Sequence, residues 1–383
     1  MRLCVKKFLP ILFCLATLFA PKTARAHGLV FTRVEAMFGT PGVVQLTIDY
    51  DLSLVLPQPE AYFPLTQSSP ATQRAAVERA LPLIREALEF YAGDMRLELE
   101  LQGFSLPALP ESAYADPAQD KSTVLRFTAK LPATPAPLVM VVPYGARVHH
   151  PVLFAAGSPA AGVLARSWVE EGPSEAFEWA AIAGGVARAP NGATATSPWH
   201  VELRTYLRLG FRHIFPQGLD HMLFVLALFF LGLEWRKLIA QTTVFTLAHA
   251  TTLFLSRYGV ISLPGKYVEP LIAFSIACIA LENIWRPKLG PARLALVFAF
   301  GLVHGLGFAG SLAEVEFPRD QFLVALLGFN LGVDLGQLFV IAVAFLAVGW
   351  LRNKPWFRDR ITVPSCWAIA AVGLFWTVQR VFF

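Results

Sequence analysis

The sequence lacks the residues that build disulfide frameworks and thiolate metal centres. Its four cysteines are Cys4, Cys14, Cys278 and Cys366, and no two of them form a CxxC pair. Any metal site must therefore use nitrogen and oxygen ligands. A G-x-x-x-x-G-K-[ST] phosphate loop and an H-E-x-x-H zinc motif are also missing. We therefore expect neither ATP-driven chemistry nor a zinc hydrolase of that type. We also expect that the protein is not an enzyme and holds no prosthetic group.

Charged residues are scarce as well. They make up 15% of the 383 residues, whereas 55% are hydrophobic, and the mean hydropathy is +0.52. This balance is too apolar for an ordinary soluble protein. The net charge of +5 comes from basic residues in loops between apolar stretches, which excludes a nucleic-acid-binding patch and predicts a lipid bilayer as the main partner.

The N-terminus has the pattern of a secretory signal peptide over 1–26. A basic start precedes an apolar run, 8–20, and an A-x-A cleavage site, 24–26. The alternative is an uncleaved anchor helix, but the run is short for a membrane span. Cleavage would make His27 the first residue, with an amine and an imidazole that could together bind copper or nickel.

Residues 27–200 predict an exported, periplasmic, mainly β domain with one inserted amphipathic helix, followed by a linker rich in Ala, Thr, Gly and Pro at 187–198. The helix is expected over 71–91, with Pro82 kinking it or starting a second helix. Apolar alternation or a short apolar run predicts strands at 44–50, 95–101, 125–131 and 138–142.

Residues 201–383 predict a polytopic bundle of six transmembrane helices. The expected spans are 208–232, 238–255, 268–285, 293–312, 322–350 and 363–382. An exported N-terminal domain makes loops one, three and five cytoplasmic, and these hold nine Lys and Arg residues against three in the outer loops. This agrees with the positive-inside rule. We therefore expect a bacterial inner-membrane protein with its N-terminal domain and C-terminus in the periplasm.

Ionisable side chains interrupt the apolar spans, and such groups need a partner or a water-filled cavity. In the first span, His213 and Asp220 are seven residues apart and are expected on one side of a helix, next to His221. Pro216 and Gly218 between them predict a kink or an unwound turn. These residues could bind a metal, or the His and Asp could simply satisfy each other.

The later spans each add a candidate with its own structural alternative. His249 could instead be a hydrogen-bonded core histidine, and Glu282 could pair with Arg286 one turn away. His304 could lie at a tight helix crossing, because Gly301, Gly305 and Ala309 form a small-residue face. Asn330, Asp334 and Gln337 share one helix face, which could be a polar contact between helices or part of a metal site.

Depth favours one site over scattered pairs. At a rise of ~1.5 Å per residue, His221, His249, His304 and Asp334 fall in the outer half or the middle of the bilayer, although their helices run in opposite directions. Glu282 lies lower, near the inner exit. We therefore predict a single metal path, open to the periplasm, whose exit passes Glu282.

The membrane half resembles the HupE/UreJ family of nickel and cobalt permeases, in the branch with a large exported N-terminal domain. The motifs lie in the same order over the C-terminal half: 213–221, 245–249, 269 with 282–283, 301–308 and 329–337. The best-known members have five residues between the His and the Asp-His pair, but this chain has six. They also repeat His-Gly in the later motif, which here occurs once, at 304–305.

The resemblance implies His213, Asp220, His221 and His304 as metal contacts, and the depth argument adds His249 and Asp334. Asn330, on the same helix face as Asp334, and Glu282, at the expected exit, complete the candidates. It implies a divalent cargo, nickel or cobalt rather than zinc, copper or iron. The alternative is a non-transporting sensing or assembly factor whose exported domain binds a periplasmic protein. In that domain, His149, His150 and His200 are further metal candidates, with surface or interdomain histidines as the simpler interpretation.

Overall fold

The computed structural model describes residues 30–114, 119–184, 198–231, 234–286, 288–313 and 321–382. They form two compact units, one mainly of Val30–Thr205 and one that begins at Tyr206 and includes Phe322–Phe383. The signal peptide, His27 and most of the expected linker lie outside the described residues. Each unit is described by itself.

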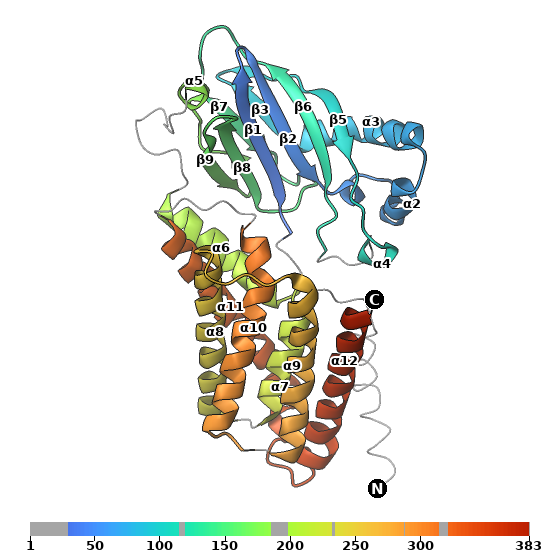
Figure 1. The fold of residues 1–383 in the computed structure, drawn as a ribbon, viewed down its shortest axis with the longest axis vertical. Helices are drawn as coiled ribbons and strands as arrows, with labels where there is room; N and C mark the ends of the chain where they lie inside the picture. The colour runs from blue at the N-terminus through green and yellow to red at the C-terminus, as the bar shows by residue number, and fades with distance from the viewer. Residues whose placement is uncertain are drawn as a thin grey trace. The chain divides into compact units, whose positions relative to one another are not determined.

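The first unit contains two β-sheets (Figure 1). The larger has the order β5-β6-β2-β1-β8-β9 and the smaller β10-β7-β3-β4. The strands are β1 (Thr32–Thr40), β2 (Val43–Tyr50), β3 (Glu89–Ala92), β4 (Met95–Arg96), β5 (Glu100–Ser105), β6 (Thr123–Lys130), β7 (Leu138–Val142), β8 (Val152–Ser158), β9 (Gly162–Val169) and β10 (Gly172–Pro173).

Alternation along the strands places one row of side chains in a common core. In β6, Thr123, Leu125, Phe127 and Ala129 are buried while their neighbours are more exposed, as a sheet with one covered face requires. Phe90 of β3 meets Phe154 of β8 with ring centroids 6.0 Å apart, so the two sheets share this core. The pairing is antiparallel except between β1 and β8, which run parallel.

Helix α3 (Pro70–Ala87) packs Val77, Leu81 and Ile84 into the same core. It begins at Ser69, whose hydroxyl accepts a hydrogen bond from the amide of Thr72. One helix runs through Pro82, so no second start occurs there. Short helices also occur at α2 (Tyr62–Thr66), α4 (Glu111–Tyr114) and α5 (Trp179–Ala183), which the sequence did not predict.

The predicted end of the long helix was wrong. The chain leaves α3 at Ala87 and becomes strand β3, which contains Tyr91. Leu88, Phe90 and Ala92 are all buried, and they alternate with more exposed residues, so the strand period overrides the helical one. Strands β2, β6 and β7 match their predictions within two residues, whereas the single strand expected over 95–101 is divided between β4 and β5.

The second unit is a helical bundle. Its helices are α6 (Trp199–Ile214), α7 (Leu219–Leu231), α8 (Trp235–Arg257), α9 (Gly265–Trp285), α10 (Pro291–Ala313), α11 (Phe322–Val348) and α12 (Val363–Phe382). In the described part, five helical segments are long and apolar enough to cross a membrane, and a sixth span results if α6 and α7 count as one broken span. The chain is therefore a membrane protein.

Small residues let the helices of the bundle approach closely. A methyl group built on Gly301 or Gly305 of α10 would lie 2.7 Å from the carbonyl oxygen of Phe245 or 2.6 Å from that of His249, both on α8. The expected small-residue face is thus the surface that packs α10 against α8. Leu331, Leu335 and Leu346 of α11 are exposed at the surface of the helical unit, as lipid-facing side chains would be.

Candidate metal site

The first span is broken where the sequence places Pro216 and Gly218. Helix α6 ends at Ile214, α7 starts at Leu219, and their axes differ by 73°. Proline cannot donate an amide hydrogen bond. A side chain at Gly218 would lie 2.1 Å from the carbonyl oxygen of His213, so only glycine fits this turn. The predicted kink is confirmed.

The break changes which side chains meet. His213 lies in the last turn of α6 and Asp220 in the first turn of α7, so the expectation that they share one side of a continuous helix was wrong. The two histidines meet instead. The ring centroids of His213 and His221 are 4.5 Å apart.

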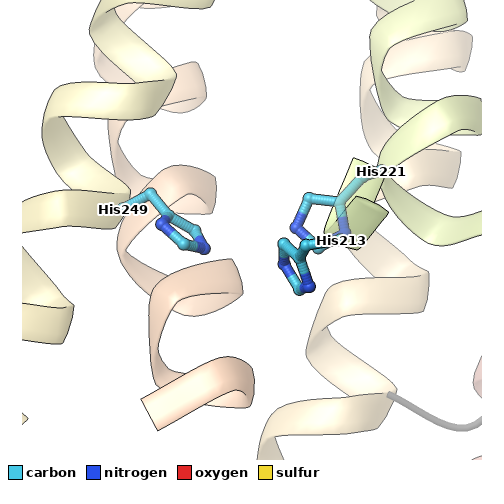
Figure 2. Close-up of side chains that lie close together, drawn as sticks. All are labelled: His213, His221 and His249. Atoms are coloured by element: carbon cyan, nitrogen blue, oxygen red, sulfur yellow. The ribbon is translucent and has the colours of Figure 1, made fainter. Parts of the chain in front are cut away.

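His249 completes a cluster of three buried histidines. It comes from the middle of α8, with its ring centroid 6.0 Å from that of His213 and 6.1 Å from that of His221. One ring nitrogen from each histidine lies within 4.8 Å of the other two. Figure 2 shows His249 facing the other two rings from its own helix. Three segments far apart in the sequence thus direct imidazoles into one space.

The separations suit a shared metal ion. Imidazole nitrogens bind ions such as zinc at ~2.0–2.1 Å, so two donors on one ion lie ~3–4 Å apart. Small side-chain rotations would bring the three nitrogens to that distance. Neither ring nitrogen of His249 makes a hydrogen bond of normal geometry to the described residues, although the side chain of Asn330 lies nearby. The cluster therefore offers imidazole nitrogens as ligands for a metal ion.

Aromatic rings enclose the cluster. Phe308 lies 4.3 Å from the His213 ring between centroids, and Phe329 stacks on Phe308 at 4.6 Å. Phe245 approaches both His221 and His249, at 6.1 and 6.2 Å. Such apolar neighbours keep the local dielectric low, which strengthens any bond between a cation and the imidazoles.

His304 lies beside the cluster without joining it. Its ring centroid is 4.8 Å from that of His221, but its Nε2 is 3.0 Å from the hydroxyl of Ser275 on α9. That contact fixes the ring against α9. Nδ1 of the same ring makes no hydrogen bond of normal geometry among the described residues, but His304 is not part of the group of three metal-ligand histidines. The structure therefore places His304 as a neighbour of the three histidines.

The carboxylates of the bundle each have another partner. Asp220 receives two hydrogen bonds from Arg380, at 3.1 and 2.9 Å. Glu282 pairs with Arg293 at 2.6 Å, rather than with Arg286 as the one-turn spacing suggested. Asp334 accepts a hydrogen bond from Thr246 at 2.7 Å. None of them joins the histidine cluster in the described part of the chain.

Amide side chains make up the rest of the polar stripe on α11, and their oxygens, Asn330 Oδ1 and Gln337 Oε1, make no hydrogen bond of normal geometry among the described residues. Gln337 donates to the hydroxyl of Thr246 at 3.3 Å, so Asp334 and Gln337 share one partner on α8, as expected for residues on the same face. Asn330 donates to the backbone carbonyl of Leu326 at 2.7 Å. This stripe links α11 to α8 one turn from His249.

Two arginines were missed by reasoning from the sequence. Arg380 lies in the last turn of α12, and Arg293 in the first turn of α10 is buried rather than part of a loop. The signal was present, because a charged residue inside an apolar span requires a partner of opposite sign. Without Arg293, the positive-inside comparison still gives eight basic residues against three.

His149, His150 and His200 belong to no group of three metal-ligand side chains among the described residues. His149 Nε2 lies 3.0 Å from the carboxylate of buried Asp51, whose other oxygen accepts from the amide of Ser53. Burial alone would raise the pKa of Asp51, but the hydrogen bonds from His149 and Ser53 outweigh it and hold the pKa below its usual value. His200 is exposed. The described residues of the β-sheet unit contain no group of three metal-ligand side chains.

The family comparison covers the helical unit. A family model described as HupE / UreJ protein matches residues 190–380. The chain belongs to the HupE/UreJ family. The HupE/UreJ match includes His213, His221 and His249 together with Arg380, whereas nearly all of the β-sheet unit precedes it. No curated protein and no solved structure matches the chain.

Proposed function

We propose that this protein is an inner-membrane permease for a divalent transition metal, nickel or cobalt. Membership of the HupE/UreJ family supports nickel or cobalt handling, and the apolar helices support a site within the bilayer. The observation that carries the proposal is the cluster of His213, His221 and His249, buried inside the bundle with their donor nitrogens within 4.8 Å of one another.

The ligand chemistry selects the class of cargo. Imidazole suits nickel, copper, zinc and iron, whereas magnesium and calcium prefer oxygen ligands. A site of neutral imidazoles also leaves the full charge of the ion uncompensated, which favours release over storage. Because imidazole must be deprotonated to bind, metal binding weakens at acidic pH.

The route follows the ligands through the bundle. The ion enters from the periplasmic side, exchanges water for imidazole at the histidine cluster, and leaves past Glu282. Glu282 is bonded to Arg293 in this structure, so the exit requires that pair to separate. Energy comes from the membrane potential, a proton gradient or a partner, because the sequence has no phosphate-binding loop.

Uptake of radioactive nickel and cobalt into proteoliposomes tests the proposal. We expect saturable uptake by the wild-type protein and its loss in His221→Ala, with the variant still present in the membrane. The exposed His200→Ala serves as the matched control and keeps its uptake. Metal that binds to the wild type without entering the lumen would replace the permease with a sensing or assembly factor.

A further inference from the structure

A buried ion pair ties the start of α7 to the end of α12. The side chains of Asp220 and Arg380 are 6% and 4% exposed, and two nitrogen-to-oxygen contacts of 3.1 and 2.9 Å join one guanidinium nitrogen to both carboxylate oxygens. The same guanidinium donates to the backbone carbonyl of Glu269 on α9 at 3.0 Å. Arg380 therefore connects three helices through one side chain.

The position of this pair matters because His221 directly follows Asp220. The first turn of α7 comes straight after the break, and the tight turn at Gly218 brings it against His213. An anchor on Asp220 fixes the rotation of that turn. The direction of the His221 ring toward His213, with centroids 4.5 Å apart, depends on that rotation.

The ion pair also determines whether the Asp220 carboxylate can bind a metal ion. Both carboxylate oxygens face a resident cation, and a metal ion would have to displace Arg380 to use either of them. Separating the pair inside the bundle would leave a buried charge without compensation, which is strongly unfavourable. The three histidines can receive a metal without breaking it.

We propose that Arg380 is a positioning residue for the metal site. Together with Asp220 it holds the start of α7 and keeps the Asp220 carboxylate away from the cargo, so that His213, His221 and His249 supply the protein ligands. This inference rests on the proposed function, since it concerns the same metal site. It gives the Asp of the Asp-His pair a role different from that of a metal ligand.

A double-mutant cycle separates positioning from ligation. Asp220→Asn, Arg380→Gln and the double variant are purified as full chains, and their nickel affinity is measured by equilibrium binding. Each single variant leaves one buried charge unpaired and is expected to bind nickel more than about 10-fold more weakly. The double variant, with two neutral side chains that can still hydrogen-bond, should return to within about 3-fold of wild type.

The opposite results would overturn the proposal. If Asp220 is a ligand, the double variant binds as weakly as Asp220→Asn, and the visible absorption of the cobalt-loaded double variant differs from wild type. If Arg380→Gln alone binds nickel normally or more tightly, Arg380 does not position the site. Arg380→Lys keeps the charge with a single nitrogen, and we expect it to bind nickel with intermediate affinity even if Arg380→Gln does not fold.

A matched control uses the exposed pair Glu234 and Lys237, whose side chains are 68% and 38% exposed. Glu234→Gln/Lys237→Gln should leave nickel affinity and the cobalt spectrum unchanged. Binding is measured on purified protein and does not depend on flux. Wild-type protein that binds nickel but does not transport it therefore refutes the permease and leaves the cycle decisive, whereas wild type that binds no metal refutes both.

Discussion

At the scale of single residues, the main feature of the bundle is how its charges are compensated. Arg380 and Arg293 form ion pairs with Asp220 and Glu282, whereas Asp334 accepts a hydrogen bond from the neutral hydroxyl of Thr246. The neutral imidazoles of the cluster remain as the donors gathered in one place. The type of a residue does not show whether it binds a metal or forms an ion pair. The residues that contact it, which come from distant helices, distinguish the two roles.

The Asp51–His149 pair gives a prediction for the β-sheet unit. Because hydrogen bonds hold the pKa of Asp51 below its ordinary value of 3.8, the carboxylate stabilises the fold above that pH, and this contribution is lost as the pH falls further. Asp51→Asn should lower the free energy of unfolding at pH 7 by ~1–3 kcal/mol, through lost hydrogen bonds to a buried charged group. Denaturant unfolding of the full chain at pH 7 and near pH 3 measures the difference.

The sign of the pH effect is the test. The difference between wild type and Asp51→Asn should shrink as the pH falls below 3.8. A difference that stays constant or grows would show that the charge of Asp51 is not the stabilising feature. Asp94→Asn, at an exposed position in the same unit, is the control and should change stability little at either pH.

At the scale of elements, the approach of α10 to α8 sets the position of His249. A side chain at Gly305 would lie 2.6 Å from the carbonyl oxygen of His249 and 3.0 Å from the Cβ of Thr252. Gly305→Ala should therefore push α8 away, lower stability by ~1–3 kcal/mol and weaken nickel binding. Thermal unfolding and equilibrium nickel binding of the purified protein measure the two effects.

Gly290 provides the control for this substitution. A methyl group there would meet no atom within 4 Å, so Gly290→Ala should leave both stability and nickel affinity unchanged. If Gly305→Ala behaves like Gly290→Ala, the close packing of the two helices does not position His249.

The sequence predicted the helices and strands better than it predicted the contacts between them. Pro216 and Gly218 identified the break in the first span, because their backbone properties are local. The seven-residue spacing of His213 and Asp220 misled, since it assumed a helix that continues through the break. The partner of Asp220 lies 160 residues away, and no local pattern carries such a contact. The helix predicted over 71–91 was too long, because Leu88 and Tyr91 continue its helical spacing although the chain there already alternates as a strand.

At the scale of the whole molecule, the chain combines two units with different chemistry. The β-sheet unit has a core shared by two sheets, whereas the helical unit contains the histidine cluster and nearly all of the family match. Depth counting put His221, His249, His304 and Asp334 in the outer half or the middle of the bilayer, and of these four the cluster contains His221 and His249. Depth could not separate them from Asp334 and His304, because it does not specify rotation about a helix axis.

X-ray absorption at the nickel edge of the loaded, purified protein identifies the atoms that bind the metal. We expect nickel to be coordinated mainly by imidazole nitrogens from His213, His221 and His249, with one ligand fewer in His249→Ala and no loss in His304→Ala. Coordination by carboxylate and water oxygens that is unchanged in His249→Ala would show that nickel binds somewhere other than the histidine cluster.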